Sequence, residues 1–61
     1  MSERIYLGEG PVSKGYKYVG YEQEGKLYVE LVEAYGAEWA VDELLVENMT
    51  EMKEYIVINN N

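Results

Sequence analysis

The segment YKYVGYEQEGKLYVELVE, residues 16–33, decides the fold of this chain. Two runs rich in β-branched and aromatic residues, 16–22 and 26–34, flank a short polar stretch that contains Gly25. Such a pattern is typical of a β-hairpin. We expect a three-residue loop, 23–25, with Gly25 in the left-handed conformation. The two-residue alternative would require a positive φ at Glu24, which is unfavourable for a residue with a Cβ atom.

The three-residue loop fixes which side chains share a face of the hairpin. It pairs Tyr21 with Leu27, Val19 with Val29 and Lys17 with Leu31, so that one face is mainly aliphatic. The opposite face carries four residues that we assign to a dimer interface: Tyr16, Tyr18, Tyr28 and Val32. A chain of 61 residues has one small core. We therefore expect the aliphatic face to pack within the chain and the tyrosine face to pack on a second copy, giving a homodimer.

The segments outside the hairpin predict two more strands and a helix. Residues 2–7 and 54–58 are strand-like, and the first is ended by Gly8. Apolar residues recur at spacings of three and four through residues 37–52, which favours an amphipathic helix. The fold class is then α+β, a small antiparallel sheet of three to four strands with one helix, in a single domain that spans residues 1–61. The alternative for this segment is a strand and a turn in a small SH3-like β-barrel, and Asn48 before Glu51 resembles a capping box that restarts or breaks the helix.

The composition argues against catalysis. The chain has no His and no Cys, so the commonest general base and the strongest nucleophile are missing. We expect no enzyme activity, no cofactor and no metal site. No apolar run approaches the roughly 20 residues that span a bilayer. We therefore expect no contact with a membrane and a cytoplasmic location, which the lack of cysteine fits.

Acidic residues concentrate in the second half of the chain. The net charge is −7, and residues 30–54 contain eight acids and one base. On the expected helix, an acidic ridge forms opposite the apolar stripe, with Trp39 at its border, from Glu43, Glu47, Glu51 and Glu54. Direct binding to nucleic acid is disfavoured because it requires Lys and Arg against phosphates. A protein with a basic surface is the expected partner, although such a ridge also serves simply as a solubilising face.

Size, acidity, the carboxylate row and the missing catalytic groups together resemble the small acidic proteins that phages encode to block host enzymes. These include DNA-mimic inhibitors of uracil-DNA glycosylase and short dimeric proteins that oppose the Hachiman defence system. The resemblance is one of character over the whole chain and carries no diagnostic motif. It implies a non-enzymatic anti-defence inhibitor that occupies a nucleic-acid groove or another surface of a host enzyme, in the host cytoplasm.

Two other functions remain open from the residues alone. A nucleotide-signal sponge would stack a base on the tyrosines at a dimer interface, with phosphates near Arg4, Lys14 and Lys17. A structural or adaptor domain would need neither the tyrosines nor the acidic residues.

Overall fold

The computed structural model describes residues 3–36 and 39–58, and the expected hairpin lies at its centre. Strands β2 (Tyr16–Gln23) and β3 (Lys26–Glu33) pair antiparallel, and Gln23 and Lys26 form the last pair before the loop. The loop is therefore Glu24-Gly25, with φ of 54° and 78°, as in a type I′ turn. Our three-residue loop is wrong. The eight cross-strand pairs compensate for a left-handed Glu24, which costs about 1–2 kcal/mol.

In this register the side chains of the two strands share faces in a different combination from the expected one. A shift of one residue moves every side chain of a strand to the other face of the sheet. Gly20 lies opposite Val29, and Tyr21 lies opposite Tyr28. Side chains of directly opposed residues share a face. We call the face that carries Gly20 and Val29 the inner face, and the face that carries Tyr21 and Tyr28 the outer face.

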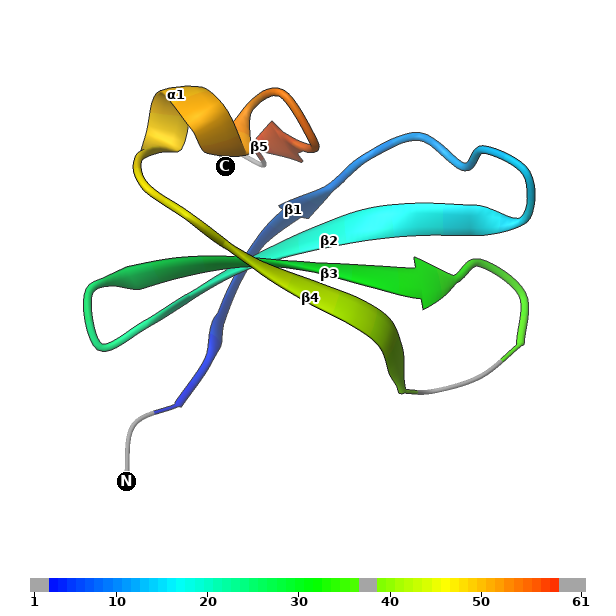
Figure 1. The fold of residues 1–61 in the computed structure, drawn as a ribbon, viewed down its shortest axis with the longest axis horizontal. Helices are drawn as coiled ribbons and strands as arrows, with labels where there is room; N and C mark the ends of the chain where they lie inside the picture. Colours follow the sequence, from blue (N-terminus) through cyan, green and yellow to red (C-terminus); the bar gives the residue numbers. More distant parts are fainter. Residues whose placement is uncertain (1–2, 37–38, 59–61) are drawn as a thin grey trace.

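Three further strands extend the hairpin into one twisted sheet with the order β4-β3-β2-β1-β5 (Figure 1). They are β1 (Ile5–Glu9), β4 (Ala40–Val46) and β5 (Val57–Ile58). The first strand does not end at Gly8, because the chain passes through that glycine with an irregularity in its register. Of the expected C-terminal strand 54–58, only the last two residues are strand.

The predicted helix over residues 37–52 is wrong within the described part of the chain, and so is the α+β class. Residues 37 and 38 lie outside the described residues. Strand β4 forms six pairs with β3, and the only helix among the described residues is the single turn α1 (Met49–Met52). An edge strand with apolar residues on both faces imitates a helical stripe, and pairing with β3 overrides the local helix propensity. The molecule is a small β fold, and the strand and turn of our alternative describe this segment.

The core lies between the inner face and the chain that follows β4. Met52 and Ile56 are buried against Val29 and Val46, with Met52 completely inaccessible. Figure 1 shows α1 and β5 above the region where the other strands cross. Asn48 caps α1, since its Oδ1 accepts a hydrogen bond from the Glu51 backbone N–H at 2.8 Å. The expected cap at Asn48 is thus present, but the capping box is incomplete, because the Glu51 carboxylate accepts from the Glu47 backbone N–H rather than from that of Asn48.

Candidate interaction surfaces

An arginine cluster on the outer face connects the residue before β1 with strands β3 and β4. The guanidinium of Arg4, just before β1, lies over the rings of Tyr28 and Tyr21, at 4.9 and 5.8 Å from their centroids. It forms ion pairs with Glu30 of β3 and with Glu43 of β4, the latter at 2.8 Å. Cation–π contacts and charge-assisted hydrogen bonds of this kind are stabilising. Arg4 therefore links the N-terminus to the edge strand β4.

The pKa values of the two carboxylates that pair with Arg4 shift in opposite directions. The hydrogen bond from Arg4 lowers the pKa of Glu43 below its ordinary value. Burial raises the pKa of Glu30, whose side chain is only 18% exposed, and its neighbour Glu43 raises it further. Desolvation thus outweighs the attraction of Arg4 at Glu30, whereas at the more exposed Glu43 the hydrogen bond from Arg4 outweighs desolvation.

A second group of polar contacts covers the outer face near β1. The carboxylate of Glu9 accepts hydrogen bonds from Lys17 Nζ and from the Tyr6 hydroxyl, both at 3.0 Å. The Tyr6 ring meets the Tyr21 ring edge to face, with centroids 6.2 Å apart. Val19 is buried on this same face. The chain therefore covers much of its second apolar face with its own charged and aromatic side chains.

The four residues predicted to form a dimer interface do not share a surface. Tyr16 and Tyr18 belong to the inner face, whereas Tyr28 and Val32 belong to the outer face. The ring of Tyr18 also packs against the ring of Tyr55, with the ring centroids 5.1 Å apart. The tyrosine face of our sequence analysis is therefore not present as one surface, because it depended on the incorrect loop.

The predicted acidic ridge is divided by the structure. Glu43, which lies on β4, forms an ion pair with Arg4. The other three carboxylates follow β4 on one short segment, in the link, in α1 and just after α1: Glu47, Glu51 and Glu54. The Glu51 carboxylate accepts a hydrogen bond from the Glu47 backbone N–H at 3.2 Å. Within the described residues none of the three forms an ion pair with Lys or Arg. We call this group the carboxylate turn.

Trp39 directly precedes β4 and is 71% exposed. The expected helix would have set Trp39 at the border of the acidic ridge, whereas strand β4 separates Trp39 from Glu47, Glu51 and Glu54. The large exposed area is what an anchor residue for a binding partner requires, since tryptophan is enriched at binding hot spots.

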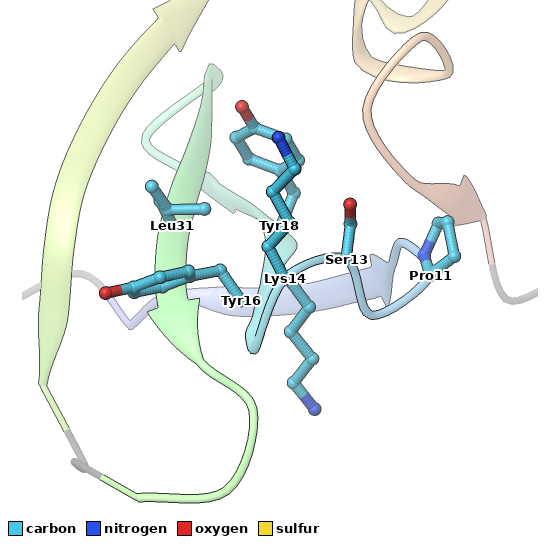
Figure 2. Close-up of a pocket in the computed structure, with 7 residues that line it drawn as sticks. Pro11, Ser13, Lys14, Tyr16, Tyr18 and Leu31 are labelled. Carbon is cyan, nitrogen blue, oxygen red and sulfur yellow. The ribbon is translucent and has the colours of Figure 1, made fainter.

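A hollow of about 240 Å³ lies where the β1–β2 loop meets the inner face (Figure 2). Tyr16, Tyr18 and Leu31 supply apolar walls, and Ser13 and Lys14 stand at the loop side. A tight turn holds this loop in place, because Ser13 and Tyr16 exchange two backbone hydrogen bonds of 2.7 and 3.0 Å. Lys14 and Gly15 both have positive φ in this turn. The hollow thus combines aromatic rings with an ammonium group.

Sequence reasoning missed the arginine cluster. The shared face of Arg4 and Tyr6 was readable from their alternation, but the partners of Arg4 come from β2, β3 and β4. Only the pairing of strands far apart in sequence brings these groups together. The carboxylate turn, by contrast, was readable as three acids at spacings of four and three.

Comparisons with protein-family models, with curated proteins and with solved structures gave no match to this chain. Across residues 3–36 and 39–58, no three acidic, His or Cys side chains are grouped in a way that could hold a metal ion. The same residues contain no helix with the length and apolarity needed to cross a membrane.

Proposed function

We propose that this protein is a non-enzymatic inhibitor that binds a basic surface of a nucleic-acid-processing enzyme, as the phage anti-defence proteins that it resembles in character do. The observation that carries the proposal is the carboxylate turn. Glu47, Glu51 and Glu54 lie on one eight-residue segment and have no cationic partner in the described chain. Closely spaced carboxylates can replace nucleic-acid phosphates in front of Arg and Lys.

Two further features support a protein partner. Trp39 offers a large exposed aromatic surface at the other end of β4. The net charge of −7 would attract a basic partner over a distance and accelerate association. Because the partner works on nucleic acid, the proposed place of action is the cytoplasm of the host.

Capture from a bacterial lysate, followed by an activity assay of the captured enzyme, tests the proposal. The test variant combines Glu47→Gln, Glu51→Gln and Glu54→Gln, and the amide introduced by Glu51→Gln retains an oxygen that can accept from the Glu47 N–H. The matched control makes the same charge change elsewhere in the chain. It combines Glu3→Gln before β1, Glu22→Gln in β2 and Glu33→Gln in β3. Glu43 is left unchanged because its loss would break the contact with Arg4.

We expect the wild type and the control to inhibit the captured enzyme, and the carboxylate-turn variant to lose at least tenfold in potency. Inhibition should weaken as salt rises from 0.1 to 1 M, because the screening length falls from about 10 to about 3 Å. Equal potency of the two triple variants, or no dependence on salt, would overturn the proposal. Circular dichroism of each variant verifies that its sheet is intact.

The hollow at Tyr16 and Tyr18 favours a second function, capture of an aromatic anion such as a nucleotide. Base rings stack on aromatic side chains, and Lys14 supplies a positive charge for a phosphate. Titration with adenosine and guanosine monophosphates, followed by amide shifts in NMR spectra, tests it. Binding that weakens in Lys14→Gln but not in Lys53→Gln would support this function, and unchanged spectra at millimolar nucleotide would exclude it.

A further inference from the structure

Strand β4 is a long open edge of the sheet. Its pairing partner among the described residues is β3, so its other side presents backbone N–H and C=O groups without a strand. Its apolar side chains are exposed as well: Val41 is 52%, Leu44 38% and Leu45 63% exposed. Exposed, apolar edge strands are templates for pairing with another strand. Among the described residues, the opposite edge, β5, has two residues in strand conformation.

The regular part of β4 has a defined midpoint. The pairing with β3 is irregular at Val41, since Leu31 lies opposite Asp42 and Val32 lies opposite Ala40. From Asp42 to Val46 the register is continuous. Leu44 is the middle residue of this five-residue stretch. An antiparallel partner centred on Leu44 would therefore use the entire regular stretch, with no bulge in it.

The positions of the acids select the same centre. In a two-fold antiparallel pair, the side chains of directly opposed residues lie on the same face of the sheet. The two-fold axis must therefore pass between the two copies of one residue, which lie directly opposite each other. Centred on Leu44, the pairing sets Glu43 opposite Leu45 and Asp42 opposite Val46. Centred on residue 43, it would set Glu43 against its own copy, and centred on residue 45, Glu43 against Glu47. Opposed like charges destabilise a sheet.

From this arrangement we infer that the chain forms a homodimer by antiparallel pairing of β4 with β4 of a second copy, with the two-fold axis at Leu44. The pairing joins the two sheets edge to edge and brings the two Leu44 side chains together beside the buried Val46. It replaces the tyrosine interface expected from the sequence. It is independent of the proposed inhibition, because the carboxylate turn follows the paired stretch.

Disulfide cross-linking tests the register, and the absence of native cysteine makes it clean. In Leu44→Cys, the two Cα atoms would be directly opposed, about 4.5–5.5 Å apart, within the range that a disulfide bridges. An added oxidant that takes two electrons from the two thiols should link most of the protein. In Leu45→Cys, the two Cα atoms would be offset by two residues along the strands and would lie about 8–9 Å apart. This variant should remain unlinked. An equimolar mixture of Glu43→Cys and Leu45→Cys should link across the pair.

Sedimentation of the wild type supplies the second measurement. The mass should rise from 7.1 kDa to about twice that value with concentration. Because both copies carry a charge of −7, added salt should favour the dimer. This is the reverse of the salt effect expected for enzyme binding, so the two proposals can fail separately. A monomer at millimolar concentration, or a dimer in which Leu44→Cys links no better than Leu45→Cys, would overturn the inference.

Discussion

Gly20 provides a sharp test of the core, because its missing side chain makes room for the chain after β4. A Cβ atom at this position would lie 2.3 Å from Ile56 Cδ1 and 2.8 Å from Met52 Sδ. Both of these side chains are buried and cannot turn towards solvent. We expect Gly20→Ala to cost about 1–3 kcal/mol as an overpacking change. A chain of this length has about 3–9 kcal/mol of stability in total, so the loss is a large part of it.

A double-mutant cycle isolates the clash. Ile56→Val removes the Cδ1 atom that the new methyl group would meet, and alone it should cost about 0.5–1.5 kcal/mol. Combined with Gly20→Ala, it should relieve part of the strain, so that the double variant is more stable than the sum of the single changes predicts. Gly36→Ala is the matched control, since its Cβ would meet nothing closer than 3.7 Å and should be nearly neutral.

Urea unfolding followed by circular dichroism measures these free energies. The thermal midpoint of Gly20→Ala should fall by at least about 4 °C, at about 4–8 °C per kcal/mol for a small domain. If Gly20→Ala proves as harmless as Gly36→Ala, or if the effects of Gly20→Ala and Ile56→Val are strictly additive, then Ile56 does not pack on Gly20.

Three further substitutions test local features. Glu24→Asn should stabilise the hairpin by a few tenths of a kcal/mol to about 1 kcal/mol, because Asn tolerates the positive φ that a type I′ turn requires; an unchanged urea midpoint would contradict the turn. Asn48→Ala should cost about 0.5–2 kcal/mol by removing the cap of α1, and Asn48→Asp, which keeps the acceptor, should cost less. Lys17 and Tyr6 lower the pKa of Glu9, so the stability that Glu9 adds should be present above its ordinary pKa of 4.5 and lost as the pH falls through the lower folded value. Glu9→Gln should therefore reduce the urea midpoint at pH 7 and leave it unchanged near pH 2, and equal losses at both pH values would refute the ion pair.

The strands were largely readable from the sequence, because the β-branched and aromatic runs at 16–22 and 26–34 differ little from the observed bounds. The loop between them was not. A positive φ at Glu24 is locally unfavourable, and the compensating pairs extend along eight residues of each strand. That one-residue difference in register scattered the predicted tyrosine surface over two faces.

The helix failed for a related reason. Leu44 and Leu45 are spaced for a helix with Val41, but each is exposed on one side of an edge strand rather than buried in one stripe. Residues 33–38 contain no Ser, Thr, Asp or Asn that could cap a helix beginning near Gly36, which is a local sign against that helix. Asn48, by contrast, caps the short turn α1. The three acidic residues after β4 lie close together, as expected, because they fall within eight residues of sequence. Glu43 instead pairs with Arg4, a contact between distant parts of the chain that no local sequence pattern predicts.

Steady-state kinetics of the captured enzyme distinguish inhibition at the nucleic-acid groove from inhibition elsewhere on the enzyme. If the carboxylate turn occupies the groove that binds nucleic acid, the apparent KM for the nucleic-acid substrate should rise linearly with the concentration of this protein, while kcat stays unchanged. The triple variant of the carboxylate turn should need at least ten times the concentration to raise the apparent KM equally. A fall in kcat with unchanged KM would rule out binding of the carboxylate turn in the groove, because the enzyme would then be inhibited away from its substrate site.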